Sequence, residues 1–322
     1  MPEELQQLLL NVFKNAFADR LEADIHPLLQ EVKTHLYNRD FLTAFGRQDY
    51  LDAYAARWSP SRALGYLQVM TESKEQILPT VHDVNKSDNL ATRIVCLGGG
   101  AGAEIVALGG FISTLAQPKP TGEQQQTRFE VVAIDIANWS AIVGKLLQNL
   151  TSPPPLSKHA SATAKAANTA LVNSEQLQVK FHQHDILHVD FSDLMPLLQG
   201  AHVITIMFTL NELYATSLSL TQKLLLNLTS YLEDGALLLV VDSPGSYSTV
   251  SLNGTEKNYP MQWLLDYTLL RQDHRDEAPA WTKVTEDGSK WFRLSHSLAY
   301  PIELENMRYQ LHLYKRRRLS TG

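Results

Sequence analysis

The chain has 322 residues, enough to bury one large core and a small accessory module. Apolar residues make up 44% and charged residues 19%, and the formal net charge of −6 gives no global attraction to nucleic acids or anionic membranes. A single cysteine excludes an internal disulfide framework. The sequence shows neither a signal peptide nor the roughly 18 uncharged apolar residues of a membrane span. We therefore expect an intracellular protein without membrane association.

The first 90 residues show a helical pattern. Apolar side chains recur at helical spacing over residues 8–17 and again over residues 28–36. In RWSPSRALGYLQVM, Pro60 stands near the start of a further helix, where its missing N–H costs little. The sequence therefore predicts a helical N-terminal module over residues 1–90.

From residue 91 onward, strand and helix patterns alternate, which predicts a mostly parallel sheet with helices on both faces. In such doubly wound α/β folds the ligand binds beyond the carboxyl ends of the strands. The expected strands are 94–97, 131–134, 179–182, 203–208 and 236–241, and the expected helices are 104–116, 142–150, 193–198 and 219–232.

The end of the chain predicts further elements of the sheet domain, which spans residues 91–322. After the helical segment YPMQWLLDYTLL, residues 281–284 and 291–294 suggest a strand or a hairpin. RYQLHLYKRRR alternates as a final strand, and a tight return before it favours antiparallel addition to the sheet. Two polar stretches, 117–128 and 152–176, are expected to be surface loop insertions.

A glycine-rich turn, LGGGAGAE, follows the first strand and permits close approach of the backbone to a ligand. The turn is compatible with two cofactors. Gly98, Gly100 and Ala103 fit the motif of dinucleotide-binding proteins, and Gly98, Gly100 and Gly102 fit the motif of S-adenosylmethionine-binding proteins. Gly99 belongs to the same expected cofactor loop. In most S-adenosylmethionine enzymes an acid stands two residues before the first glycine, where this chain has Cys96. Glu104 can offer the carboxylate instead, or can simply favour the helix N-terminus.

Two further acids are expected at strand tips. Asp135 ends the second strand, where a carboxylate can accept both ribose hydroxyls of either cofactor. Asp185 follows the third strand and can accept from an adenine amino group. Trp139 can pack on the adenine or serve as a core aromatic. The other side chains assigned to the cofactor pocket are Ile136, Ile186 and Phe208.

The histidines in VKFHQHDILHVDF invite a metal-site interpretation. His182 and His184 share one strand face, with His188 and Asp190 nearby. Because no cysteine ligand is near and Asp185 already has a role, we expect structural or solvent-facing histidines and no bound metal.

The segment ITIMFTLNELYATS places polar residues after the fourth strand, beside the expected position of a transferred group. Asn211 can contact a base edge, and Glu212 can position or remove a proton. Alternatively both residues only begin the next helix, since Asn is a strong N-cap. The fifth strand presents Asp242 to the same pocket, which makes Asn211, Glu212 and Asp242 the catalytic candidates.

Four segments carry a family resemblance: LGGGAGAE, FTLNELY, VVDSPGSYS and YPMQWLLDYTLL. Together they resemble the fungal family of S-adenosylmethionine-dependent methyltransferases that act on uridine N3 of large-subunit ribosomal RNA. The resemblance implies a class I methyltransferase fold, Rossmann-like, whose seven-stranded, mostly parallel sheet has an antiparallel last strand. It also implies S-adenosylmethionine as the donor, with Gly98, Gly100, Gly102, Asp135 and Asp185 as cofactor residues.

The implied acceptor is a ribosomal uridine, whose N3 must be unpaired or flipped out to receive the methyl group. Candidate stacking aromatics are Tyr214, Tyr247 and Trp263, each of which can equally be a core residue. Arg57, Arg62 and the basic run 315–318 can contact RNA or remain solvated.

The expected partner is ribosomal RNA or a preribosomal particle, in the nucleus, the nucleolus or the cytoplasm. Three alternatives stay open: a methyltransferase acting on a protein or small molecule, an NAD-dependent dehydrogenase, and an idle assembly module with the same fold. The oligomeric state has no signal in the sequence.

Overall fold

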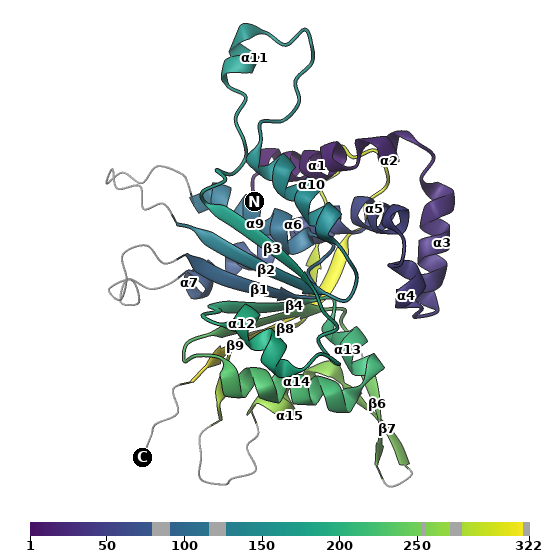
Figure 1. Ribbon diagram of the computed structural model, residues 1–322, viewed down its shortest axis with the longest axis vertical. Coiled ribbons are helices and arrows are strands. Elements are labelled where there is room, and N and C mark those ends of the chain that lie inside the picture. The colour runs from purple at the N-terminus through teal and green to yellow at the C-terminus, as the bar shows by residue number, and fades with distance from the viewer. Residues whose placement is uncertain (79–90, 116–126, 246, 253–254, 271–278, 318–322) are drawn as a thin grey trace.

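The computed structural model describes residues 1–78, 91–115, 127–245, 247–252, 255–270 and 279–317. A seven-stranded sheet stands at the centre, with helices on both of its faces (Figure 1). Within these described segments, no helix is long and apolar enough to cross a bilayer.

The central sheet has the strand order β3-β2-β1-β4-β5-β9-β8. The first five strands pair in parallel, whereas β9 is antiparallel to both β5 and β8. This arrangement confirms the expected α/β sheet, and the strand order reverses between β1 and β4, where ligands bind. The strands are β1 (Thr92–Leu97), β2 (Phe129–Asp135), β3 (Leu177–Gln183), β4 (Val203–Met207), β5 (Leu237–Asp242), β8 (Trp281–Phe292) and β9 (Met307–Arg316).

The inner strands form because short apolar runs are covered on both faces of the sheet. Every residue of β4, VITIM, and of β5, LLLVVD, is buried. Such continuous runs are easy to recognise in a sequence, and the predicted strands agree with the structure to within about two residues at each end.

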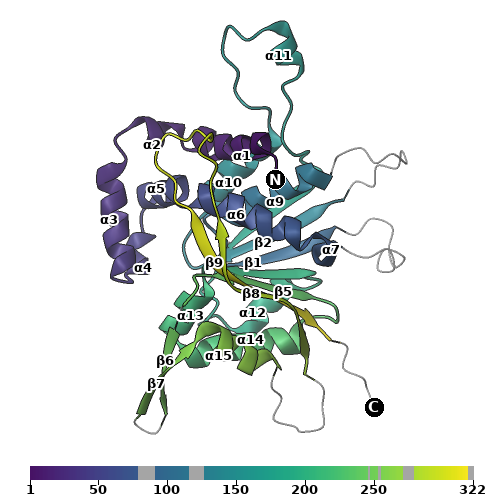
Figure 2. The ribbon, with the colours of Figure 1, turned by 180° about the vertical axis from the view of Figure 1, so that it is seen from behind.

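Helices pack on each face of the sheet around a separate hydrophobic core (Figures 1 and 2). Leu9, Leu64 and Phe111 belong to the first core, and Leu225 and Leu265 belong to the second. The first face carries α1 (Glu3–Ala16), α6 (Ser59–Glu72), α9 (Ala103–Leu115) and α10 (Ser140–Thr151), and the second carries α12 (Phe191–Leu198), α13 (Leu210–Thr216), α14 (Leu218–Tyr231) and α15 (Met261–Leu270).

The N-terminal helices share the core of the sheet domain. A Cβ added to Gly110 of α9 would lie 2.8 Å from side-chain atoms of both Leu9 and Leu67, so the helices meet at close range. The remaining N-terminal helices are α2 (Ala18–Glu22), α3 (His26–Tyr37), α4 (Phe41–Ala44), α5 (Gln48–Arg57) and α7 (Lys74–Ile77). The helical character expected of this region is confirmed, whereas a domain boundary near residue 90 stays a prediction because residues 79–90 lie outside the described part.

The C-terminal strands differ in detail from the expectation. For residues 281–284 and 291–294, expected as a strand or a hairpin, the strand is confirmed, since β8 begins at Trp281 and continues through two register irregularities to Phe292. The return to β9, however, is not tight. Residues 293–306 pass beside the N-terminal helices, where the Tyr300 hydroxyl donates to the Ala56 carbonyl oxygen (2.8 Å) and Arg57 pairs with Glu305 (2.6 Å).

Two excursions extend from the sheet domain. The predicted insertion at 152–176 contains the short helix α11 (Ala162–Ala166) and projects from the body at the top of Figure 1. A two-stranded hairpin, β6 (Tyr247–Leu252) with β7 (Thr255–Pro260), projects at the other end. The other predicted insertion, 117–128, lies outside the described residues except for its last two positions.

Candidate cofactor and acceptor site

A cavity of about 360 Å³ lies at the carboxyl ends of β1, β2 and β4. Its volume falls in the range of small-molecule sites. Three parts of the chain line it: the tips of the parallel strands, the first turns of α13, and side chains from α3 to α6 in the N-terminal region. The cavity is therefore at the switch in strand order, as expected of this fold.

The glycine turn after β1 brings backbone to the edge of this cavity. Gly98 has φ +83°, and a Cβ there would lie 2.2 Å from the Thr209 hydroxyl oxygen. A Cβ on Gly100 would lie 2.0 Å from the Trp139 ring. Gly98 lines the cavity directly, whereas Gly99 packs toward Cys96 and Gly102 toward Leu146. The turn thus needs glycines for close packing as well as for ligand access.

Glu104 brings a buried carboxyl group to the cavity, whereas position 96 holds a cysteine. Cys96 is buried at 1% exposure, and burial raises the pKa of its thiol, so it stays neutral. Glu104 lines the cavity at 4% exposure, and its Oε1 has no hydrogen-bond partner among the described residues. Burial raises its pKa to about 8, an effect strengthened by Asp135 and opposed by Arg62. A buried acid with a free oxygen facing a cavity is suited to a cationic ligand group.

Asp135 ends β2 as predicted and borders the cavity. Its carboxylate accepts hydrogen bonds from the Gly100 N–H (3.0 Å) and the Ala137 N–H (3.2 Å). Burial raises its pKa, and these backbone donors oppose that shift. The hydrogen bond to Gly100 ties the second strand to the glycine turn.

Beyond Asp135 the cavity wall is a mixture of apolar and acidic groups. Ile136 is 46% exposed and lines the cavity, as do Asp185 and Ile186. One Asp185 oxygen accepts from the Leu187 N–H (3.0 Å), and the other lies 2.8 Å from Nδ1 of His188. This arrangement combines an apolar surface with a hydrogen-bond acceptor, as a purine would require.

Trp139 forms the floor behind the glycine turn. It is 2% exposed and lies in an aromatic cluster, with ring centroids 5.3 Å from Phe45 and 5.7 Å from Tyr54. Its edge borders the cavity, but most of its surface is packed against protein. The core role therefore describes Trp139 better than an exposed adenine platform.

The end of β4 has an unusual backbone conformation. Phe208, which lines the cavity, has φ +54°, a left-handed conformation that costs a bulky residue free energy. Its N–H donates to the Val241 carbonyl oxygen at 2.6 Å, which holds the turn against β5. Strained residues of this kind are concentrated at functional sites.

Of the three catalytic candidates, only Glu212 lines the cavity. Its Oε2 is buried and lacks a hydrogen-bond partner within the described residues. Asp242 is 2% exposed and accepts from the N–H groups of Asn211 (2.9 Å) and Ser243 (2.7 Å). Burial raises the pKa of Asp242 to about 6, against the lowering effect of those two donors. Asp242 thus holds the first turn of α13, and it places Asn211 and Glu212 in their positions.

Arg62 is the main residue of this site whose role the sequence did not reveal. Its guanidinium lines the cavity from α6, donates to the Tyr54 hydroxyl (2.6 Å), and lies 5.0 Å from the Phe208 ring centroid. No carboxylate of the described residues forms an ion pair with it. The Ser59 hydroxyl, one turn earlier, donates to the Ala101 carbonyl oxygen (2.8 Å) and fixes α6 against the glycine turn.

Two of the three candidate base-stacking aromatics, Tyr214 and Trp263, lie away from the cavity. Tyr214 is buried at 3% exposure in the second core, and the side chain of Tyr247 lies outside what the structure describes. Trp263 is exposed, with Tyr259 and Tyr267 stacked against its ring at centroid distances of 4.5 and 5.2 Å. Neither Tyr214 nor Trp263 lines the cavity.

The other candidate groups have local explanations. His182 and His184 stack on each other with centroids 6.5 Å apart. Within the described residues, no set of three or more His, Cys, Asp or Glu side chains is placed to hold a metal ion. Arg57 pairs with Glu305, and the buried Arg316 of the basic run donates to the Thr229 and Ala280 carbonyl oxygens.

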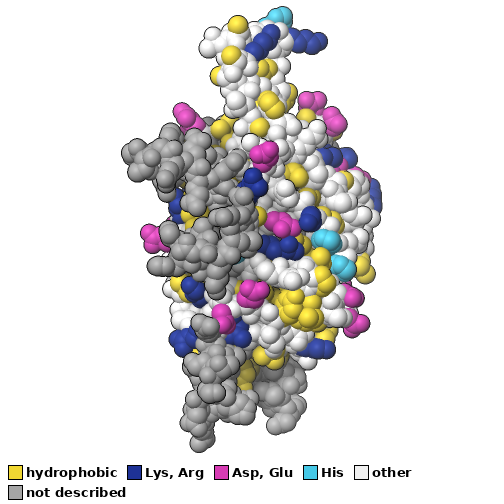
Figure 3. Space-filling view, turned by 60° about the vertical axis from the view of Figure 1, so that its left-hand side comes forward, with side chains coloured by type: hydrophobic (Ala, Val, Ile, Leu, Met, Phe, Trp, Pro, Cys, Tyr) yellow, Lys and Arg dark blue, Asp and Glu magenta, His cyan; other side chains and the backbone are white. Residues whose placement is uncertain are grey.

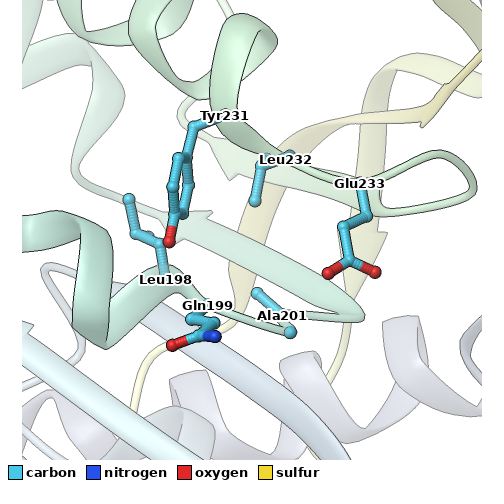
Figure 4. Close-up of a pocket in the computed structure, with 7 residues that line it drawn as sticks. Leu198, Gln199, Ala201, Tyr231, Leu232 and Glu233 are labelled. Atoms are coloured by element: carbon cyan, nitrogen blue, oxygen red, sulfur yellow. The ribbon is translucent and has the colours of Figure 1, made fainter.

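A second, smaller cavity of about 170 Å³ lies between the ends of α12 and α14 (Figure 4). Its lining residues Gly200 and Glu233 precede β4 and β5, so it is at the amino end of the sheet, opposite the first cavity. The Tyr231 hydroxyl at its wall already donates to the Met195 carbonyl oxygen (2.8 Å). This cavity brings no reactive groups together.

The strand order, the glycine turn after β1 and the acid at the end of β2 define a class I methyltransferase architecture. A family model described as "Putative SAM-dependent methyltransferase" matches residues 13–315. The chain is also 32% identical, over 96% of its length and 85% of the relative's, to the 25S rRNA (uridine(2843)-N(3))-methyltransferase of Saccharomyces cerevisiae. The chain therefore belongs to this family of S-adenosylmethionine-dependent methyltransferases, and the dinucleotide interpretation of its glycines is set aside.

Solved structures with a similar arrangement are more distant. A methyltransferase from Methanosarcina mazei is 9% identical with a TM-score of 0.39, covering 74% of this chain and 99% of that one. The N-methyltransferase NodS from Bradyrhizobium japonicum, in complex with S-adenosyl-L-homocysteine, is 11% identical with a TM-score of 0.37, covering 83% of this chain and 97% of that one.

Proposed function

We propose that this protein transfers a methyl group from S-adenosylmethionine to N3 of a uridine in large-subunit ribosomal RNA. The observation that carries the donor assignment is a cavity lined by Glu104, whose buried Oε1 has no hydrogen-bond partner within the described residues, and by Arg62, which forms no ion pair with an acid among them. The acceptor half is supported by the yeast relative, whose name states that reaction and whose similarity extends over 96% of this chain.

The residues present fit the donor. Its amino-acid end carries an ammonium and a carboxylate, and the cavity offers the free Glu104 oxygen to the first and the Arg62 guanidinium to the second. Asp135 is assigned to the ribose hydroxyls, and Ile136, Asp185 and Ile186 to the adenine. When bound, S-adenosylmethionine supplies a methyl group made electrophilic by the positively charged sulfur.

The protein contributes alignment of the acceptor and removal of one proton. An unpaired uracil enters beside Phe208 and Thr209, with N3 directed at the methyl group. On transfer of the methyl group to N3, the Glu212 carboxylate would accept the proton that N3 loses. Asn211 and Asp242 are assigned to positioning, because neither lines the cavity.

The proposal also includes the partner, the compartment and the domain organisation of the chain. The substrate is ribosomal RNA or a preribosomal particle, and the site of action is inside the cell, with the nucleus as the expected compartment. Residues 1–90 act as a helical module that completes the cofactor cavity of a methyltransferase domain over residues 91–322, with insertions at 117–128 and 152–176.

The experiment combines two measurements on the full chain. Calorimetric titration with S-adenosylmethionine, S-adenosylhomocysteine and NAD should show binding of the first two only, and Asp135→Ala should weaken both. Methyl transfer to unmodified ribosomal RNA, followed by nucleoside mass spectrometry, should yield 3-methyluridine. Glu212→Gln should lower this rate about 10²- to 10⁴-fold with the cofactor affinity unchanged. Cofactor binding together with methylation of protein or small molecules instead of RNA would refute the acceptor assignment.

A further inference from the structure

An exposed tryptophan at the end of β8 stands between two arginines. Trp291 is 46% exposed, and the guanidinium carbons of Arg293 and Arg308 lie 4.9 and 5.8 Å from its ring centroid. Trp291 and Arg308 are directly paired across β8 and β9, and Arg293 follows two residues later on the same side of the chain. We name Trp291, Arg293 and Arg308 the tryptophan–arginine cluster.

The positive charge of this cluster is not neutralised by the protein. Neither arginine forms an ion pair with any acid of the described segments, and Nε of Arg308 donates to the Ser289 hydroxyl (3.0 Å). Nearby cations behave differently, since Lys290 pairs with Glu72 and Arg57 pairs with Glu305. The cluster therefore combines a wide exposed aromatic surface with two available cations.

The cluster lies at the same end of the sheet as the cofactor cavity. Gln310 of β9 pairs with Asp242, the last residue of β5, so Arg308 stands two residues beyond the carboxyl end of that strand. Strand β8 is three positions from β4 in the sheet, which at about 4.8 Å per strand is roughly 15 Å. A nucleic acid with one base at the end of β4 can span that distance with a few nucleotides.

On the described part of the opposite end, positive and negative side chains are mixed. In the view of Figure 3, toward the amino ends of the parallel strands, Lys and Arg side chains are scattered among acidic ones on the surface that is not grey. The formal net charge of −6 also repels a polyanion overall. The tryptophan–arginine cluster therefore offers a polyanion local positive charge that the net charge of the chain does not.

We propose that the tryptophan–arginine cluster binds unpaired nucleotides of the RNA substrate next to the methylated uridine. A base stacks on the exposed indole, and the guanidiniums of Arg293 and Arg308 contact the flanking phosphates, as in other single-strand sites. This inference rests on the proposed RNA substrate. It adds the surface that holds the strand outside the cavity.

The test measures binding of a fluorescent single-stranded RNA of about a dozen nucleotides to the full chain, as a function of salt. Trp291→Ala should weaken binding about 5- to 150-fold, and Trp291→Phe should restore much of the loss. The double variant Arg293→Gln/Arg308→Gln should lower the slope of log affinity against log salt by about 1.4, or 0.7 for each lost phosphate contact.

Trp263→Ala is the matched control. Trp263 is 41% exposed, close to the exposure of Trp291, but Tyr259 and Tyr267 already stack against its ring. This variant should bind RNA as the native chain does, and all the variants should keep native affinity for S-adenosylhomocysteine, which shows that they are folded.

The outcomes separate the inference from the proposed function. Native RNA binding and methylation with no change in the cluster variants would overturn the inference alone and leave Arg293 and Arg308 as charges that protect an edge strand. An equal loss in Trp263→Ala would also overturn it. If the native chain neither binds nor methylates RNA, both the inference and the proposed acceptor fail.

Discussion

The buried acid Glu104 gives the proposed donor site a definite pH dependence. Its pKa of about 8 means that about 97% of the carboxyl is protonated at pH 6.5 in the ligand-free protein. Pairing with the ammonium of S-adenosylmethionine requires the ionised form, so binding must release a proton. We expect about 0.9 proton released per cofactor bound at pH 6.5.

The same linkage sets the change in affinity. Raising the pH from 6 to 7 increases the ionised fraction of a group with a pKa of about 8 roughly ninefold, so the dissociation constant should fall by about that factor. Above pH 8 the gain ends, because Glu104 is ionised and the cofactor's α-amino group, with an ordinary pKa of about 7.7–8.0, loses its own proton. The affinity should therefore be greatest near pH 8.

Calorimetry in two buffers of different ionisation enthalpy measures both the released protons and the affinity. Glu104→Gln should abolish the proton release and flatten the affinity between pH 6 and 7. At pH 8 it should weaken binding about 10- to 150-fold, the value of a hydrogen bond to a charged group. The control ligand is 5′-methylthioadenosine, which lacks the amino-acid end and should bind native and variant chains alike. A native affinity that is constant from pH 6 to 7, or an equal slope in Glu104→Gln, would refute the assignment of Glu104 to the ammonium.

Three further predictions concern residues around the same cavity. Gly98→Ala should lower the free energy of unfolding by about 1–3 kcal/mol in urea titrations, because φ is +83° and the added Cβ would meet Thr209. As a control, Gly144→Ala should raise the free energy of unfolding by about 0.5–1 kcal/mol, because nothing lies within 4 Å of the added Cβ. Arg62→Met should weaken S-adenosylmethionine binding about 10- to 150-fold in calorimetry. Decarboxylated S-adenosylmethionine should bind native and variant chains equally, and a matching loss with that analogue would contradict the carboxylate contact. The pKa of Asp242 is about 6 in the folded chain and near 3.8 in the unfolded chain. Between these values the native state holds a proton that the unfolded state has lost, so the free energy of unfolding falls as the pH rises. Asp242→Asn should lack that loss, which is about 2 kcal/mol between pH 4 and 7, and parallel stability curves for the two chains would show that Asp242 is already ionised when folded.

Much of the fold could be predicted because its signals are local. A buried run such as VITIM is recognisable wherever it occurs, and the last residue of such a run must lie at the end of its strand. Asp135 was placed correctly at the tip of β2 for this reason. The prediction of a tight return before β9 was wrong, because residues 293–306 follow the surface of the N-terminal helices. Such long-range contacts leave no periodic pattern in the sequence.

The site was predictable only in part, for a similar reason. The residues at the ends of the strands could be assigned from the sequence, but whether each of these side chains faces the cavity depends on the residues that contact it. Asp242 ends β5 as expected, but its carboxylate accepts a hydrogen bond from the Asn211 N–H and does not line the cavity. Arg62 precedes the glycine turn by 36 residues and enters the cavity only because α6 packs on α9. Its proposed contact with the cofactor carboxylate remains a prediction.

The N-terminal helices also determine which groups face each other across the cofactor cavity. Arg62 and Glu104 both face this partly desolvated space, but they form no ion pair with each other. Glu104 has an unpartnered Oε1, and Arg62 has no carboxylate partner among the described residues, so the two buried groups are only partly satisfied by the protein. A zwitterionic ligand placed between them satisfies both at once, so its binding should stabilise α6 against the glycine turn as well as fill the site. A ligand that binds only the native state stabilises it by RT ln(1 + L/Kd), where L is the free ligand concentration, so tighter binding gives more protection. S-adenosylmethionine should therefore protect α6 from hydrogen exchange in the native chain and much less in Arg62→Met.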